Sequence, residues 1–184
     1  MNRRGLLLAM TALCGLVAAP RALAGDLPPA PAGFTWVTPA NGAGSFLRPD
    51  GWFTKEETQG DTQAFFVTKT PIVDGGRFDV GFTVNAFHHL ARHGRAPSVW
   101  ARAMLARLAA GRQTLKSGVV KGNAVDMNVL RVVDTAGGPP VVIHYLAIGD
   151  DAKDCGWLIF FEAPQPEWDA DYPIAQTMLN GFGL

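Results

Sequence analysis

The sequence predicts an α+β domain built around an antiparallel β-sheet that is covered on both faces. Short segments of strand character run through residues 34–162, whereas only 97–110 and 172–179 have helix character. Helices that are few and segregated from the strands are typical of an antiparallel α+β architecture. The central strand, 140–149, carries apolar side chains at both alternations, which predicts that each face of the sheet packs against another layer.

Five strands are predicted ahead of the first helix, over residues 35–37, 44–47, 52–58, 63–70 and 77–87. The turn Arg48-Pro49-Asp50-Gly51 separates the second strand from the third, and Gly60-Asp61 turns the third into the fourth. The fifth strand alternates apolar and polar side chains, so it is expected to bury one face.

The segment 97–110 is the clearest helix, because Pro97 suits a first turn and Gly111 suits a stop. Its spacing predicts a buried stripe that consists of Trp100, Met104, Leu105 and Leu108. Arg102 falls on the opposite side of this helix, and Arg107 falls at the edge of the stripe.

Three further strands are predicted after this helix, at 123–133, 140–149 and 156–162. The segment 117–122, which contains Gly118 and Gly122, is predicted to be a turn. The last predicted element is a short helix at 172–179 with Pro173 in its first turn.

Residues 1–24 have the pattern of a cleavable signal peptide. Arg3 and Arg4 give a positive start, about 15 apolar residues follow, and Ala22-Leu23-Ala24 offers a cleavage site before Gly25. The apolar run is shorter than the roughly 20 residues of a spanning helix, so no membrane anchor is expected after cleavage. The two arginines fit a twin-arginine signal and an ordinary Sec signal, and both routes stay open. Lipidation at Cys14 is the weaker alternative, because a large leucine precedes it.

The expected product is periplasmic or secreted, with a Pro- and Ala-rich leader at 25–33 and one domain at 34–184. Cleavage removes three arginines and leaves 13 basic and 16 acidic side chains. Because no basic excess remains to hold a polyanion, nucleic acid is not expected as a partner.

Two segments carry a resemblance to a known superfamily. The first, Ser45-Phe46-Leu47-Arg48-Pro49-Asp50-Gly51-Trp52, ends a strand in an apolar-x-Pro-x-Gly-Trp turn. The second begins with Trp157-Leu158-Ile159-Phe160-Phe161-Glu162-Ala163-Pro164 and continues through Trp168 to Met178-Leu179-Asn180-Gly181-Phe182. The first segment is similar to the opening of PsbP-like domains, and the second is similar to their ending. The resemblance spans most of the chain after the leader.

The resemblance implies an α/β/α sandwich around an antiparallel sheet. Members of the PsbP-like superfamily include the extrinsic PsbP subunit of photosystem II, a Ran-binding import factor and assorted bacterial exported proteins. They have binding and assembly in common rather than a shared reaction, so the resemblance implies no catalytic residues.

The only histidine cluster consists of His88, His89 and His93. If a helix follows the strand that ends at Phe87, His89 and His93 stand at i and i+4 and form a weak candidate metal pair. Two nitrogens without a positioned carboxylate or thiolate make a poor site, so a polar strand end is the alternative.

Two other candidates lie near the end of the chain. The acidic loop 150–154 contains Asp150, Asp151 and Asp154 and offers oxygen ligands for a hard cation such as calcium, although a solvated hairpin tip explains it as well. Cys155 is expected to be buried at the start of a strand, and a thiol–imidazole pair with His144 across neighbouring strands is the weaker alternative. No Gly-x-Ser-x-Gly, His-Glu-x-x-His or phosphate-loop motif occurs.

The sequence therefore predicts an exported binding or assembly-accessory protein without catalytic activity or a cofactor, whose partner is another exported or envelope protein. Two alternatives stay open. One is a carrier of a small apolar ligand or lipid in the cleft between helix 97–110 and the sheet, and the other is a thiol- or metal-dependent enzyme. An apolar pocket would favour the carrier, an exposed patch the assembly factor, and convergent unpaired polar groups the enzyme.

Overall fold

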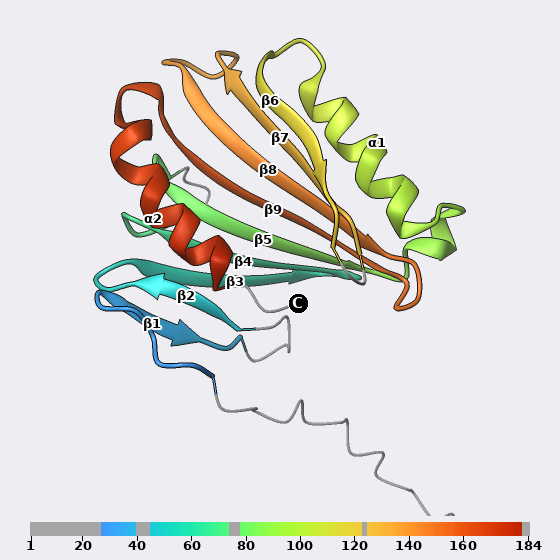
Figure 1. The fold of residues 1–184 in the computed structure, drawn as a ribbon, viewed down its shortest axis with the longest axis horizontal. Coiled ribbons are helices and arrows are strands. Elements are labelled where there is room, and N and C mark those ends of the chain that lie inside the picture. The colour runs from blue at the N-terminus through green and yellow to red at the C-terminus, as the bar shows by residue number, and fades with distance from the viewer. Residues whose placement is uncertain (1–26, 40–44, 74–77, 123–124, 182–184) are drawn as a thin grey trace, which may run out of the picture.

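The computed structural model describes four ranges of the chain: 27–39, 45–73, 78–122 and 125–181. The predicted signal peptide and the residues of its cleavage site, Ala22, Ala24 and Gly25, lie outside the described residues. Within the described ranges, seven antiparallel strands form the main sheet (Figure 1), in the spatial order β3 (Phe53–Gln59), β4 (Thr62–Thr68), β5 (Gly81–His88), β9 (Cys155–Pro164), β8 (Val141–Asp150), β7 (Met127–Asp134) and β6 (Gln113–Val120).

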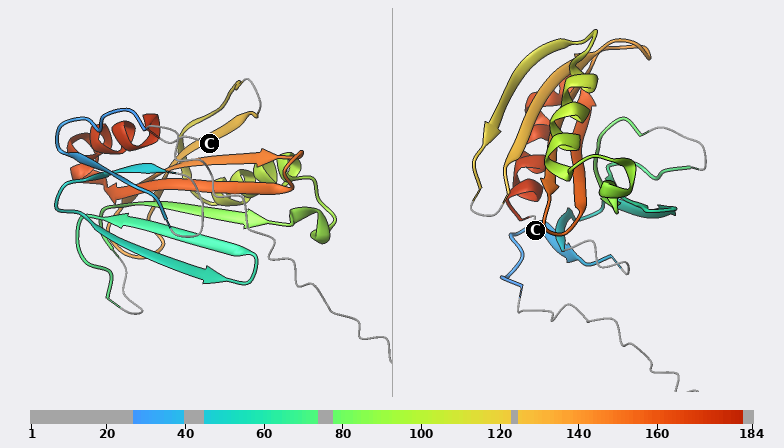
Figure 2. Two further views of the ribbon diagram at one scale, coloured as in Figure 1. Left: turned by 90° about the horizontal axis from the view of Figure 1, so that it is seen from below. Right: turned by 90° about the vertical axis from the view of Figure 1, so that its right-hand side faces the viewer.

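Both faces of the sheet are buried, as the sequence predicts. Along β8, Ile143, Tyr145 and Ala147 belong to one buried cluster, whereas Val142 and Ile148 belong to a second cluster on the other face. Successive side chains of a strand point to opposite faces, so this strand contributes to two cores at once. The two further views show how the strands twist relative to one another (Figure 2).

The first face is covered by helix α1 (Pro97–Ala109), which packs on β7, β8 and β9. Trp100, Ala101 and Leu105 are buried, while Met104 and Leu108 are only half-buried. The four predicted residues therefore all lie on the face of α1 that packs on the sheet, but the centre of that face lies at Ala101 and Leu105.

Two glycines allow α1 to approach the sheet closely. A Cβ atom at Gly149 would lie 2.2 Å from the backbone carbon and oxygen of Pro97, and one at Gly156 would lie 2.5 Å from the Trp100 ring. Real Cβ atoms do not tolerate such distances, so a larger residue at either glycine would push the helix outward.

The second face is covered by helix α2 (Trp168–Asn180) and by a hairpin of β1 (Phe34–Val37) and β2 (Phe46–Pro49). The rings of Phe46 in β2 and Phe65 in β4 lie 4.2 Å apart between centroids. The helix begins four residues before the predicted start, so Pro173 lies inside it rather than in its first turn. Burial of Trp168 against Phe161 favours this additional turn.

The predicted turn at 117–122 is wrong over most of its length, because residues up to Val120 belong to strand β6. All eight side chains of β6 are exposed, so the strand shows none of the alternation that burial of one face imposes. The predicted α+β class, with helices on both faces of an antiparallel sheet, is confirmed. Within the described residues, no helix is long and apolar enough to cross a membrane.

Candidate functional site

Strand β6 is an edge strand that pairs only with β7 among the described residues, so its outer backbone groups are unpaired there. It is eight residues long, and its apolar side chains Leu115, Val119 and Val120 are 49, 52 and 49 % exposed. Natural proteins usually shield such an edge, because it is a template for pairing with another chain. Here the main irregularity is a shift in register between Thr114 and Lys116, which leaves 116–120 as a regular ladder.

The opposite edge of the sheet is shielded by charge. Strand β3 reads Phe-Thr-Lys-Glu-Glu-Thr-Gln, and Lys55 forms an ion pair with Glu57 at 3.0 Å. Charged side chains on an edge strand oppose the approach of another strand. Strand β3 thus carries three charged side chains, whereas β6 carries only Lys116, so β6 is the edge that is more open to pairing.

The register identifies which side chains of β6 face helix α1. Ser117 pairs with Leu130, and Val119 pairs with Asn128. Leu130 belongs to the core beneath α1, so Ser117 and Val119 lie on the α1 side of the sheet. Lys116, Gly118 and Val120 face the other side.

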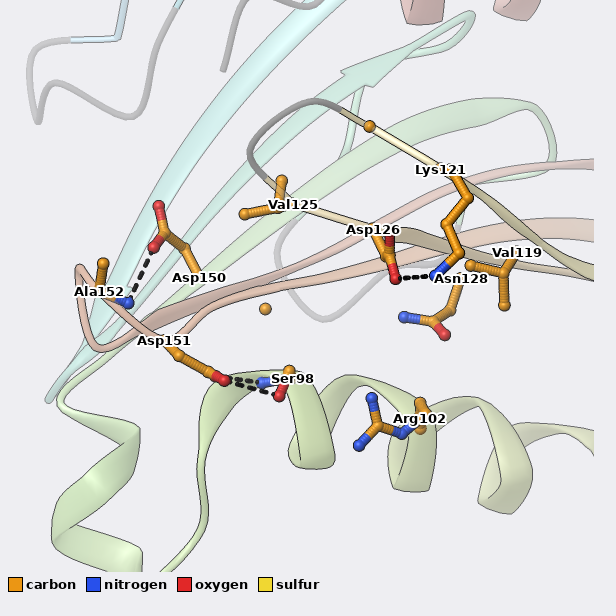
Figure 3. Close-up of a pocket in the computed structure, with 12 residues that line it drawn as sticks. Ser98, Arg102, Val119, Lys121, Val125, Asp126, Asn128, Asp150, Asp151 and Ala152 are labelled. Atoms are coloured by element: carbon orange, nitrogen blue, oxygen red, sulfur yellow. Dashed lines mark hydrogen bonds and ion pairs between the residues drawn. The ribbon is translucent and has the colours of Figure 1, made fainter.

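A cavity of about 580 Å³ lies at the α1 side of this edge. Figure 3 shows Ser98 and Arg102 of α1 on one wall and Val119 and Asn128 of the sheet on the other. Lys121 and Asp126, which also line it, form an ion pair of 2.6 Å. The cavity therefore adjoins the exposed edge strand, and its lining combines charged side chains with apolar ones such as Val119 and Val125.

The acidic loop 150–154 binds other parts of the protein instead of presenting three free carboxylates. Asp151 accepts hydrogen bonds from the backbone N–H and the hydroxyl of Ser98, at 2.7 and 2.8 Å. It thereby caps α1, whose own N-cap residue is an alanine. Asp154 accepts the N–H of Ala91 at 2.7 Å, and Asp150 accepts two amides of its own loop.

Each carboxylate of this loop thus has a structural partner. Within the described residues, no group of three or more His, Cys, Asp or Glu side chains is placed to hold a metal ion. The loop therefore has a structural role, because it joins the β8–β9 turn to the start of α1 through hydrogen bonds.

The histidines are arranged differently from the helical pair that the sequence suggests. His89 has a left-handed backbone conformation (φ 57°) just before the 3₁₀ helix η1 (Leu90–His93). His88 and His93 line a separate cavity of about 410 Å³, which His89 does not line. The i, i+4 geometry of an α-helix is therefore absent between His89 and His93. His88 contacts Gln63 at 3.4 Å through its Nε2 atom.

Cys155 and His144 do not meet. Cys155 pairs in register with Asp150 and His88, whereas His144 pairs with Phe161, six residues further along β9. Burial raises the pKa of the Cys155 thiol, which disfavours the reactive thiolate. The predicted burial of Cys155 at the start of a strand is therefore confirmed.

His144 belongs instead to a stacked cluster beneath α2. The guanidinium of Arg131 lies 4.2 Å from the centroid of the Tyr172 ring and 5.0 Å from that of Trp168. Its Nε atom donates a hydrogen bond of 3.4 Å to Nδ1 of His144. Burial, together with the nearby charge of Arg131, lowers the pKa of His144 to about 4, so the imidazole is neutral at pH 7.

The interface between α1 and the sheet, where a carrier would hold its ligand, is filled by side chains such as Ala101, Leu105 and Ile143. An apolar hollow of about 640 Å³ lies elsewhere, where the end of α2 meets Trp36, Leu47 and the proline-rich segment 27–31. Trp36 donates a hydrogen bond from Nε1 to the backbone oxygen of Pro28, at 2.6 Å.

No protein-family model and no curated protein matches the sequence. Solved structures do match. The Ran-binding protein Mog1p of Saccharomyces cerevisiae aligns at 15% identity with a TM-score of 0.51, over 82% of this chain and 94% of that chain. Cyanobacterial PsbP (CyanoP) of Synechocystis sp. PCC 6803 aligns at 10% identity with a TM-score of 0.52, over 90% of this chain and 99% of that chain.

A further structure, from Bacteroides thetaiotaomicron VPI-5482, aligns at 16% identity with a TM-score of 0.47. This chain spans 42% of that protein's length. The likeness to Mog1p and CyanoP over nearly their full lengths shows that this chain has the PsbP-like fold, which confirms the resemblance in fold that the sequence motifs indicate. At these identities the likeness concerns the fold alone.

Proposed function

We propose that this protein is an exported, non-enzymatic binding or assembly-accessory protein that takes up an extended segment of a protein partner along strand β6. The observation that carries the proposal is the edge itself, which is eight residues long, exposes three large apolar side chains and is unpaired on its outer side among the described residues. A peptide that adds a strand to such an edge gains affinity from main-chain hydrogen bonds and specificity from pockets for alternate side chains. The cavity beside Val119 is such a pocket.

The fold comparison supports a role in protein binding. Mog1p, which has this fold, is a Ran-binding protein. The partner of this chain is another exported or envelope protein, because the pattern of residues 1–24 directs the chain out of the cytoplasm. N-terminal sequencing of the exported protein is expected to start at Gly25. A start at Met1, or a lipid on Cys14, would contradict this processing.

The geometry gives the two alternatives less support. A carrier in the α1–sheet cleft would need an apolar cavity there, but side chains fill that interface, and the adjoining cavity contains charged side chains, among them Arg102, Lys121 and Asp126. A thiol enzyme would need an activated cysteine, whereas Cys155 is buried and lies apart from His144. Cys155→Ser is therefore expected to leave any cellular role intact in a variant that still folds.

The test is to map binding of a neutral strand-forming peptide by NMR. An end-blocked ten-residue peptide of alternating Val and Gln is expected to shift the backbone amide signals of 116–120 and to slow their hydrogen exchange. Shifts confined to β3, or no shifts in β6, would refute the site.

Proline variants sharpen this test because proline lacks the N–H that a new ladder needs. Neighbouring residues of an edge strand direct their amides alternately inward and outward, so one of Ser117→Pro and Gly118→Pro removes only an outward amide. That variant is expected to keep its melting temperature and lose the peptide, while the other disturbs the pairing with β7. Thr58→Pro, on the charged edge β3, serves as the matched control and should bind the peptide normally.

A further inference from the structure

The unpaired charges beside β6 are all positive. Arg102 lines the cavity next to the edge and makes no hydrogen bond or ion pair with any described residue. Lys116 of β6 has no such partner among those residues either. Two cations therefore flank the strand, one on each face of the sheet.

The carboxylates in the same region are already engaged. Asp126 is held by Lys121, and Asp134, one strand inward, is held by Arg112 at 2.8 Å. Asp151 is occupied by the start of α1. Helix α1 itself contributes no acidic side chain. The charge left available to a partner at this edge is therefore positive, although acidic side chains outnumber basic ones once residues 1–24 are removed.

Arg102 is positioned to meet a side chain of an added strand. It lies on the flank of α1 that faces the cavity, opposite Val119 and Asn128 of the sheet, as Figure 3 shows. Because Val119 points to the α1 side, a strand paired with β6 would send alternate side chains into the same space. A guanidinium there suits a carboxylate, which it can bind through two parallel hydrogen bonds.

We infer that the partner segment is acidic: an extended stretch in which Asp or Glu alternates with apolar residues, with one carboxylate bound by Arg102 in the cavity beside α1. This inference rests on the proposed pairing along β6 and adds the chemistry of its occupant. The carboxylates of the segment lie on the α1 side, and its apolar residues lie on the face that carries Lys116 and Val120. The selection of carboxylates therefore rests on Arg102 and not on Lys116.

Three end-blocked ten-residue peptides test the inference against the full chain at about 0.15 M salt, where charges further apart than about 8 Å are largely screened. In each peptide Val alternates with Glu, with Gln or with Lys. The Glu peptide is expected to bind about tenfold or more tightly than the Gln peptide, as a charge-assisted pair would give. The Lys peptide should bind more weakly than both.

Two variants separate a specific pair from general attraction. Arg102→Gln is expected to abolish the preference for the Glu peptide while leaving the affinity for the Gln peptide unchanged. Arg107→Gln removes the same charge from the same helix, but its side chain lies about 140° further round the axis and away from the cavity. The preference should survive in that variant.

The outcomes distinguish the two claims. Equal affinity for the Glu and Gln peptides would overturn the acidic inference and leave strand pairing along β6 intact. Equal loss of preference in both arginine variants would also overturn it, because general attraction would then explain the selectivity. If none of the peptides shifts the amide signals of β6, the proposed function fails and the inference fails with it.

Discussion

The buried imidazole of His144 makes the stability of the protein sensitive to mild acid. The side chain is 5 % exposed, and its pKa lies at about 4 in the folded protein, compared with 6.5 for an ordinary histidine. The folded state thus holds the neutral form, while the unfolded chain takes up a proton as soon as the pH falls below about 6.5. Stability contributed by this group is complete above that pH and is lost as the pH falls towards 4.

The size of the effect follows from the two pKa values. At pH 5 the unfolded state gains about 2 kcal/mol from protonation that the folded state cannot match, and at pH 7 the corresponding gain is about 0.2 kcal/mol. Lowering the pH from 7 to 5 should therefore cost about 2 kcal/mol through this one residue. Urea denaturation of the purified protein at the two pH values measures the total change.

A non-titrating variant isolates the contribution of His144. His144→Asn places an amide oxygen where Nδ1 accepts the hydrogen bond from Arg131. Its free energy of unfolding should fall by about 2 kcal/mol less than that of the original protein between pH 7 and pH 5. If His144→Asn loses as much stability as the original protein over this interval, the buried imidazole is not the responsible group.

Three further predictions concern how helix α1 is held on the sheet, and urea denaturation at pH 7 measures the free energy of unfolding for each. Trp100→Ala should cost about 3–5 kcal/mol because a buried aromatic ring is lost, whereas Arg102→Ala should cost under about 1 kcal/mol. Equal costs for the two variants would mean that the face of α1 that carries Arg102 is buried instead. Gly149→Ala should cost about 1–3 kcal/mol, since its Cβ would overlap the backbone of Pro97, and a neutral result would contradict the close approach. Asp151→Ala should cost about 0.5–2 kcal/mol by removing the helix cap, and Asp151→Asn should recover part of that loss because it keeps an acceptor oxygen.

The strands with buried side chains were the predictable part of the fold. The segment 140–149 was placed within one residue of β8, because burial on both faces demands apolar side chains at nearly every position. Helix 97–110 was found for a similar reason, as its proline and glycine mark both ends locally. The start of α2 was missed by four residues, because the contact that extends it, Trp168 on Phe161, joins two separate elements.

The candidate site was the part that the sequence did not reveal. The sequence predicts a turn over 117–122, where residues up to Val120 belong to strand β6, since an exposed edge strand carries no pattern of burial and two glycines favour a turn locally. Its weak signal is the pair Val119 and Val120, β-branched residues in a segment that nothing buries. The sequence singles out the histidine pair by its spacing and the acidic loop by its cluster of carboxylates, and neither pattern shows that Asp151 caps a helix 53 residues away.

The sequence by itself determined the fold class and the covered sheet, because these depend on the order of elements and on which side chains must leave water. The PsbP-like architecture was indicated by the resemblance of two segments, 45–52 and 157–182, to that superfamily. Only the tertiary structure decided which edge of the sheet is unpaired, which charges have partners, and which face of α1 adjoins a cavity. Those properties depend on neighbours that are distant in the chain. A lone arginine such as Arg102 looks the same in a sequence whether an aspartate neutralises it or an open pocket faces it.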